Sequence, residues 1–250
     1  MSHLKGKVAW ITGGGSGIGL AGGIELARAG AHVVISGRSP ETLKKAEKEI
    51  RAAGSCEAIP LDVSSKEDVA RVAAKIGRVD ILVNSAGINS PRRNFHNVSL
   101  ESWDQIVAIN LSGMFYCVHA VLPGMRSRKD GLIINVSSWA GRYASTLTGP
   151  GYNATKHAVV ALTESINMEE CANGIRATSV LPGEVATPIL EKRPVPPTPE
   201  VRARMLQADD LGRTIAFVAS LPPRACVNEI IISPTWNRFY LGGLESPPKA

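Results

Sequence analysis

The sequence predicts an α/β fold, a doubly wound parallel sheet of about seven strands with helices on both faces, from three observations. Short β-branched runs alternate with longer helical patterns along most of the 250 residues. A glycine-rich turn joins the first such run to the first helical pattern. No internal repeat or low-complexity tract interrupts the alternation. Because this length is enough for one large domain with a full core, we expect a single domain over residues 1–250.

Seven apolar runs are the expected strands. They cover residues 7–12, 32–36, 57–61, 81–84, 132–137, 176–181 and 229–233. Five helical patterns lie between them, over residues 17–29, 40–53, 66–75, 100 to about 126, and 152–173. Pro40 and Ser99 are suited to helix starts, and Asn173-Gly174 to a helix end. In an open parallel sheet, ligands bind beyond the carboxyl ends of the strands.

Two segments depart from this pattern. The proline-rich stretch 194–199 is stiff and extended, so we expect residues 184–206 to form a lid over the site. The tail 234–250 is expected to be loose, either docked on a neighbouring subunit or disordered. Glycines at positions 22 and 23 weaken the first helix, and close packing of that helix is the expected compensation.

Composition excludes several classes of function. The net charge is +6, but the basic residues are scattered and aromatic residues are only 5%, which argues against nucleic-acid binding. No apolar run reaches the roughly 20 residues that span a bilayer, so we expect no membrane association. The first residues resemble a strand rather than a signal peptide, which predicts a cytoplasmic protein. The four cysteines form no CxxC; we expect no metal site and no disulfides, and the cysteines should be buried.

The turn after the first strand, TGGGSGIG at residues 12–19, is suited to a dinucleotide. Glycine lets backbone approach a pyrophosphate closely, and the following helix offers free N–H groups. The pattern T-G-x-x-x-G-x-G matches better than the chance GxGxxG at Gly17, Gly19 and Gly22, which begins too far past the strand. A merely flexible glycine turn is the alternative interpretation.

The end of the second strand bears on which dinucleotide binds. NAD binders usually carry a carboxylate there, whereas this chain has Arg38, whose planar fork of donors fits a 2′-phosphate. We therefore expect NADP(H), with NAD(H) as the alternative and Arg38 then a solvated loop residue. Asp62 ends the third strand, where its carboxylate either reaches the adenine amino group or caps a turn or helix.

A phenol and an ammonium group lie four residues apart in YNATK, at Tyr152 and Lys156. On a helix the two side chains share one face, and a nearby cation favours the phenolate. A tyrosine with such a partner can act as an acid–base catalyst near neutral pH. The spacing alone also occurs by chance on surface helices.

Together these motifs resemble the short-chain dehydrogenase/reductase family, over residues 6–188. The resemblance is carried by TGGGSGIG, Asp62, NSAG at 84–87, Asn110, Ser138 in VSSWAG, YNATK and PGEVATP at 182–188. It implies a single Rossmann-type domain, nicotinamide-dependent redox chemistry and a catalytic set of Asn110, Ser138, Tyr152 and Lys156. The implied cofactor-binding residues are Thr12, Gly13, Ser16, Gly17, Ile18, Gly19, Arg38, Asp62, Val63, Asn84, Ala86, Gly87, Tyr152, Lys156, Pro182, Gly183, Val185 and Thr187.

The resemblance also implies roles. Tyr152 is the acid in reduction and the base in oxidation, Ser138 holds the substrate oxygen, and Lys156 favours the phenolate and binds the nicotinamide ribose. Asn110 lies mid-helix, where a local break could fix a water that links Lys156 to solvent. Asn84 is expected to tie neighbouring strands together more than to touch the cofactor. Ser138 precedes Tyr152 by one residue more than is usual in the family, and Ser137 is the competing candidate.

The expected function is therefore an NADP(H)-dependent oxidoreductase that transfers a hydride between nicotinamide and a small carbonyl compound or secondary alcohol. The alternatives are an enoyl reductase or epimerase on the same fold, or a non-catalytic NADP-binding sensor or structural subunit. Arg92, Arg93 and Arg142 are candidates to clamp an acidic group of the substrate. The two long helices, from residues 100 and 152, resemble the family's oligomer-forming pair, which predicts a homotetramer or homodimer.

Overall fold

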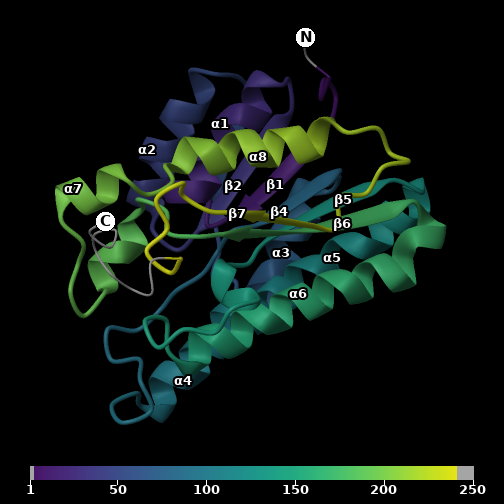
Figure 1. Ribbon diagram of the computed structural model, residues 1–250. Coiled ribbons are helices and arrows are strands. Elements are labelled where there is room, and N and C mark those ends of the chain that lie inside the picture. Colours follow the sequence, from purple (N-terminus) through teal and green to yellow (C-terminus); the bar gives the residue numbers. More distant parts are fainter. Residues whose placement is uncertain (1–2, 241–250) are drawn as a thin grey trace.

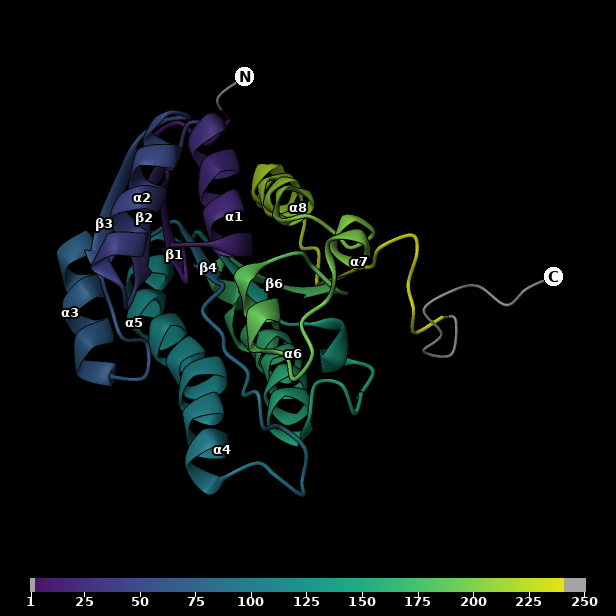
Figure 2. The same cartoon turned by 90° about the vertical axis from the view of Figure 1, so that its left-hand side faces the viewer.

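The computed structural model describes residues 3–240, which form one seven-stranded parallel sheet between two layers of helices (Figures 1 and 2). The strand order is β3-β2-β1-β4-β5-β6-β7. The strands are β1 Val8–Thr12, β2 His32–Gly37, β3 Cys56–Pro60, β4 Ile81–Asn84, β5 Gly131–Val136, β6 Ile175–Pro182 and β7 Glu229–Ile232. The predicted fold class is confirmed.

The order of the strands changes direction at β1, which pairs with β2 on one side and with β4 on the other. From β1 the chain first adds strands on the β2 side and then on the β4 side. Thr12, the last residue of β1, is in register with Ser36 of β2 and with Asn84 of β4. The carboxyl ends of these three strands therefore meet at one place. A crevice forms there because the connections leave in opposite directions.

Helices cover both faces of the sheet (Figure 1), and the short helix α7 Pro199–Ala203 lies in the lid segment. The first layer holds α1 Gly17–Arg28, α2 Pro40–Arg51 and α8 Ala208–Ser220. The second holds α3 Lys66–Ile76, α4 Leu100–Val107, α5 Gly113–Arg128 and α6 Pro150–Glu170. Alternate strand residues serve the two layers: Ile11 and Ile35 belong to the core under the first, Trp10 and Val34 to the core under the second.

The first helix packs closely on its neighbours, as the glycines at 22 and 23 predict. A Cβ at Gly22 would lie 3.0 Å from Cδ1 of Ile215 on α8, and one at Gly23 would lie 2.7 Å from Cδ1 of Ile50 on α2. These contacts offset the low helix propensity of glycine, and they bring the start of α1 to the carboxyl end of β1.

Several boundaries and burial expectations need correction. The third strand begins one residue early, and α6 starts at Pro150 and ends in a 3₁₀ turn at Cys171–Asn173. The expected single helix from residue 100 is two helices joined by a π turn at Ala108–Ser112. Cys56 and Cys117 are buried as expected, but Cys171 and Cys226 are exposed.

The run Leu100–Arg128 has a window of mean hydropathy 1.6 and is long and apolar enough to cross a membrane by those measures alone. Much of it serves the core instead, because Cys117, Val118 and Met125 pack in the cluster under the second layer. A buried core helix meets the same criteria as a membrane span, so this run is weak evidence for a membrane.

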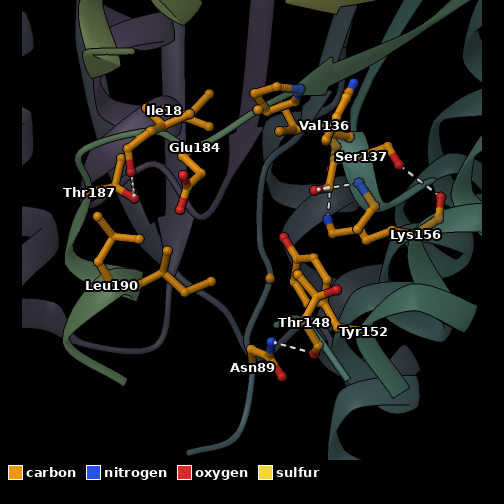
Figure 3. A pocket seen from close by; sticks show the side chains of 18 of the residues that line it. Ile18, Asn89, Val136, Ser137, Thr148, Tyr152, Lys156, Glu184, Thr187 and Leu190 are labelled. Carbon is orange, nitrogen blue, oxygen red and sulfur yellow. Dashed lines mark hydrogen bonds between the residues drawn. The ribbon is translucent and has the colours of Figure 1, made fainter. Parts of the chain in front are cut away.

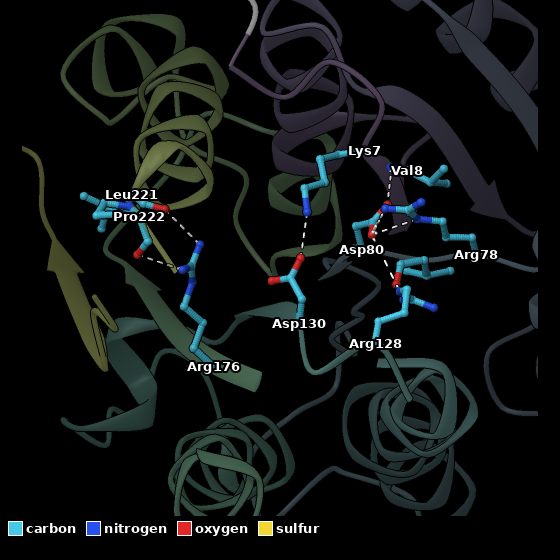
Figure 4. Close-up of polar contacts among 10 residues, drawn as sticks. Lys7, Val8, Arg78, Asp80, Arg128, Asp130, Arg176, Leu221 and Pro222 are labelled. Atoms are coloured by element: carbon cyan, nitrogen blue, oxygen red, sulfur yellow. Dashed lines mark hydrogen bonds and ion pairs between the residues drawn. The ribbon is translucent and has the colours of Figure 1, made fainter. Parts of the chain in front are cut away.

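At the amino ends of the strands, charged residues connect neighbouring strands through hydrogen bonds and ion pairs (Figure 4). The buried Asp80 accepts hydrogen bonds from the backbone N–H of Val8 at 2.9 Å and from Arg78 at 3.0 Å. Lys7 pairs with Asp130 at 2.7 Å. These polar contacts occupy the end of the sheet opposite the crevice, and they leave the carboxyl ends free for a site.

Candidate functional site

A cavity of about 280 Å³ lies at the carboxyl ends of the strands. Figure 3 shows its two walls, with Ile18, Glu184, Thr187 and Leu190 on one side and Val136, Tyr152 and Lys156 on the other. The structure brings together thirteen of the residues expected from sequence. These are Gly13, Ser16, Gly17, Ile18, Ala86, Gly87, Ser138, Tyr152, Lys156, Pro182, Gly183, Val185 and Thr187.

The glycine-rich turn is shaped by backbone contacts that exclude side chains. Gly13 has φ +68°, and a Cβ there would lie 2.7 Å from the backbone nitrogen of Ala86. A Cβ on Gly19 would collide with the carbonyl oxygen of Gly13. Helix α1 begins after Ser16, whose side chain makes no capping hydrogen bond. Its first N–H groups are therefore available to an anion, as a pyrophosphate requires.

Arg38 follows β2 and is exposed at the same edge of the sheet. The next side chain, Ser39, is used locally, because its hydroxyl accepts a hydrogen bond from Thr42 N–H at 3.3 Å and caps α2. Asp62 follows β3, and its Oδ1 accepts hydrogen bonds from the N–H of Ser64 at 3.0 Å and from its hydroxyl at 2.7 Å. The turn role that the sequence left open for Asp62 is thus present.

Tyr152 and Lys156 extend from the first turns of α6 into the cavity (Figure 3). The ammonium nitrogen of Lys156 lies 5.5 Å from the centre of the Tyr152 ring and donates a hydrogen bond to the carbonyl of Val136 at 2.8 Å. Lys156 is only 5% exposed. The lysine is thus held by the end of β5 while its neighbour faces the open space.

The protonation of this pair differs from the sequence expectation. Burial raises the pKa of the Tyr152 phenol, and a hydrogen bond from Ser138 and the charges of Arg193 and Arg93 oppose that rise. Burial also lowers the pKa of Lys156 to about 8. The expectation that the Lys156 ammonium makes the phenol acidic is therefore not supported, because burial raises the pKa of Tyr152 and the charges that lower it belong to Arg193 and Arg93.

The two candidate serines have separate positions. The hydroxyl of Ser137 is buried and donates to the backbone carbonyl of Lys156 at 2.8 Å, which ties β5 to α6 (Figure 3). The hydroxyl of Ser138 accepts a hydrogen bond from Ala140 N–H at 3.1 Å and interacts with the Tyr152 phenol. Ser137 is thus engaged by the backbone of α6, whereas Ser138 adjoins the Tyr152 phenol.

Asn110 lies in the π turn between α4 and α5, where a local break was expected. Its side chain pairs with the backbone of Ile88, accepting from the N–H at 2.8 Å and donating to the carbonyl at 3.0 Å. Asn110 and Lys156 both line a second, much smaller cavity of about 10 Å³ behind the site. Thr12, Val63 and Asn84 line it as well. A water between Asn110 and Lys156 remains a prediction.

Asn84 ties strands together, as expected, through Nδ2 to Oδ1 of Asn135 at 2.9 Å. Thr12 accepts a weak hydrogen bond of 3.4 Å from the N–H of Ala86. Both residues position the ends of β1 and β4 and lie outside the larger cavity. Gly19, Arg38, Asp62, Val63 and Asn110 also lie outside it.

The predicted arginine clamp is partly wrong. Arg142 pairs with Glu229 at 2.7 Å and with Glu164 at 3.0 Å, and it does not line the cavity. Arg92 is exposed and outside the lining, whereas Arg93 is buried and lines it. Arg193, from the segment expected to form a lid, lines it too.

Sequence reasoning missed an aromatic wall that includes the tail. Trp139 lies with its ring centre 4.8 Å from that of Tyr143 and 4.9 Å from that of Phe239, and all three line the cavity. Tyr240 also contacts Trp139, at 5.8 Å. Residues 234–240 are thus packed on their own chain, contrary to the expected loose tail; residues 241–250 lie outside the described residues. Only the run of aromatic residues at 236–240 hinted at this contact.

These features fit a nicotinamide dinucleotide. The glycine turn admits a pyrophosphate, the α1 N-terminus is free, and the cavity continues from there to Tyr152. Within residues 3–240, no cluster of three or more His, Cys, Asp or Glu side chains is arranged to hold a metal ion.

Comparisons with known proteins identify the family of the chain. The short chain dehydrogenase family model matches residues 7–196. An uncharacterized oxidoreductase of Staphylococcus haemolyticus is 32% identical over 94% of this chain and all of that protein. A D-beta-hydroxybutyrate dehydrogenase of Rhizobium meliloti is 36% identical over 75% of this chain and 74% of that protein.

Solved structures agree. A metagenomic short-chain oxidoreductase in complex with NADP has a TM-score of 0.81 and 31% identity, and the match covers 94% of this chain and 100% of that one. An alcohol dehydrogenase from the archaeon Thermococcus sibiricus, complexed with 5-hydroxy-NADP, has a TM-score of 0.83 and 27% identity, covering 93% and 98%. On its sequence, its sheet order and these relatives, the chain is an oxidoreductase of the short chain dehydrogenase family.

Proposed function

We propose that the protein is an NADP(H)-dependent oxidoreductase that transfers a hydride between nicotinamide and a small carbonyl compound or secondary alcohol. One observation carries the proposal: Ser138, Tyr152 and Lys156 share a single cavity with the glycine turn. A phosphate-binding turn and an acid–base group are thereby joined across a space that a nicotinamide and a small substrate can fill together. Two relatives are named as an alcohol dehydrogenase and a D-beta-hydroxybutyrate dehydrogenase, which supports a small alcohol or carbonyl compound as the substrate.

The preference for NADP(H) rests on charge at the end of β2. Arg38 is exposed there, next to Gly37, and no carboxylate occupies the residues 36–39. A guanidinium group attracts a 2′-phosphate and pairs with it bidentately, while a ribose 2′-hydroxyl is usually held by a carboxylate. Two relatives whose structures contain NADP or a derivative support the same choice.

The nicotinamide, when bound, supplies or accepts the hydride, and the side chains of this chain handle the proton. Tyr152 donates a proton to the developing oxyanion in reduction and removes it in oxidation. Ser138 hydrogen-bonds the same oxygen. Lys156, fixed by Val136, stabilises the phenolate and holds the ribose, and Asn110 fixes the chain at Ile88 beside it.

Replacing Tyr152 by Phe tests this proposal. The Tyr152→Phe variant keeps the ring and lacks the hydroxyl that gives and takes the proton. We therefore expect turnover of NADPH with a panel of ketones, aldehydes and hydroxy compounds to fall by at least ~10²-fold. Binding of NADPH, followed by its fluorescence, should change little. Full activity in this variant, or no NADPH consumption by the unaltered protein with any member of the panel, would contradict the proposal.

We further propose that the protein is a cytoplasmic homo-oligomer, a tetramer or dimer, without nucleic-acid or membrane partners. Apolar side chains exposed on the helices of the second layer support self-association: Trp103 is 37% exposed, Phe115 48% and Met168 72%. Light scattering of the purified protein gives the mass, and a monomer at all concentrations would refute the oligomer.

A further inference from the structure

The substrate side of the cavity carries more positive charge than its own carboxylates neutralise. Glu184 is the one acidic residue among the described residues that line the cavity. Its Oε1 pairs with Arg193 at 2.8 Å and with Arg238 at 2.8 Å. Arg93 lines the cavity as well and forms no ion pair among residues 3–240. Glu184 thus neutralises part of the charge of Arg193 and Arg238, and none of the described carboxylates that line the cavity pairs with Arg93.

Arg93 is an unusual residue to find buried without a carboxylate. It is 6% exposed, and its Nη2 donates to the carbonyl of Lys192 at 2.6 Å and its Nη1 weakly to that of Leu147 at 3.4 Å. Its Nε is buried and has no hydrogen-bond partner in the described part of the chain. A buried charge without a counter-ion is costly, so folds usually supply one.

The position of Arg93 is set by two separate segments, the loop before α6 and the lid segment. Its backbone packs against Gly149, which has φ +77° and where a Cβ would collide with the Arg93 carbonyl. Its side chain reaches Leu147 before α6 and Lys192 in the lid segment. The chain thus fixes this guanidinium group where it cannot escape to solvent.

Both arginines act on the Tyr152 phenol. The charges of Arg193 and Arg93 each lower the pKa of Tyr152, against the larger effect of burial. Arg193 also lowers the pKa of Arg93, after the larger effect of burial. Because Arg93, Arg193 and Tyr152 all line the same cavity, a group bound by the two arginines lies in the same space as the proton donor.

We propose that Arg93 and Arg193 bind a carboxylate of the substrate, so that the reacting compound is an oxo acid or hydroxy acid. A carboxylate supplies the missing counter-ion, and two arginines hold it with its neighbouring carbonyl facing Tyr152 and Ser138. The wall of Trp139, Tyr143 and Phe239 then receives an apolar substituent. This inference rests on the proposed oxidoreductase function and specifies its substrate class.

Matched pairs of substrates separate charge from reactivity. Pyruvate, acetoacetate and benzoylformate are each compared with their methyl esters, which keep the carbonyl and lose the charge. We expect the unaltered protein to reduce at least one acid with a kcat/KM at least ~10-fold above that of its ester. Arg93→Met and Arg193→Met should lower kcat/KM for that acid by about 10- to 100-fold more than for its ester, because the ester loses only the effect of each arginine on the Tyr152 phenol. Arg92→Met, an exposed neighbour, is the matched control and should change neither rate.

Retained ester turnover shows that a variant is folded and still transfers hydride, and Arg93→Lys, which keeps the charge, should recover part of the acid activity. Equal or faster reaction of every ester, with carbonyl turnover intact, overturns this inference and leaves the proposed function standing. Equal losses for acid and ester in the Met variants, or a loss of NADPH affinity, also overturn it, because the arginines then serve the fold or the cofactor. If no compound is reduced, the proposed function fails, and calorimetric titration of the NADP⁺-loaded protein with the three acids decides the carboxylate site: binding that Arg93→Met abolishes supports it, and no binding refutes it.

Discussion

Replacing Lys156 by Met should separate what this residue does for function from what it does for the fold. Lys156 is 5% exposed, and burial lowers its pKa from 10.5 to about 8. That difference corresponds to about 3 kcal/mol of unfolding free energy, which the charged ammonium takes from the folded state at neutral pH. Met has a similar length and no charge, so Lys156→Met removes the cost of burying the charged ammonium group.

The substitution also removes one stabilising contact. The ammonium donates to the Val136 carbonyl at 2.8 Å, and losing a donor to a buried carbonyl costs about 1–3 kcal/mol. At pH 7 we therefore expect the variant to be as stable as the unaltered protein or up to about 2 kcal/mol more stable. Its turnover should nevertheless fall by at least ~10²-fold, since the phenolate loses its cation.

The dependence on pH is the sharper test. Below pH 8 the lysine is protonated in both states. Between about pH 8 and 10.5 the folded protein releases this proton while the unfolded chain keeps it, so stability due to Lys156 rises with pH by up to about 3 kcal/mol. The variant lacks this rise, and subtracting its curve removes the effects of all other titrating groups that the two proteins share.

Urea unfolding of both proteins at pH 7, 8, 9 and 10, without cofactor and at one protein concentration, measures this difference. Lys44→Met, which removes an exposed lysine of α2, supplies the baseline for losing one lysine. A difference between the unaltered protein and Lys156→Met that stays level within about 0.5 kcal/mol from pH 7 to 10 would refute the reasoning.

Two further predictions address the cofactor and the serines. Arg38→Asp should shift the ratio of NADPH to NADH affinity toward NADH by at least ~10-fold, because a carboxylate repels the 2′-phosphate and accepts a hydrogen bond from a 2′-hydroxyl; fluorescence titration with both cofactors measures it, Lys44→Asp controls for charge, and an unchanged ratio removes the phosphate role. Ser138→Ala should lower turnover by at least ~10-fold and leave stability nearly intact, whereas Ser137→Ala should cost about 1 kcal/mol of stability through the lost bond to the Lys156 carbonyl. Turnover and urea unfolding are measured for both variants. A loss of turnover in Ser137→Ala with full turnover in Ser138→Ala would contradict the assignment.

Local patterns were sufficient to predict the sheet and the nucleotide turn. The alternation of β-branched runs and helices predicts a parallel sheet because each strand must be covered on both faces. Gly13 and Gly19 can be recognised from sequence because their roles are local: a positive φ at one and a backbone contact at the other. Tyr152 and Lys156 are neighbours on one helix for the same reason.

Other assignments depended on contacts between distant segments. Ser137 and Ser138 both line the cavity, but the Ser137 hydroxyl is engaged by the Lys156 carbonyl, a contact that depends on how β5 meets α6. The pKa values of Tyr152 and Lys156 are shifted most by burial, and the charges that lower the pKa of Tyr152 come from Arg193 and Arg93, which are distant in the sequence.

The substrate wall shows the same limit most clearly. Arg142 and Arg93 look equivalent in the sequence, yet Glu229 and Glu164 neutralise the first, while the second is buried in the cavity. Phe239 belongs to the cavity only because the chain returns from β7 to Trp139.

By itself, then, the sequence determined the parallel sheet, the glycine cradle and the helix that presents the phenol and the amine, since each depends on residues close together in the chain. Tertiary structure alone decided which charges remain unpaired and which aromatic rings close the cavity, because ion pairing and burial depend on residues that only folding brings into contact.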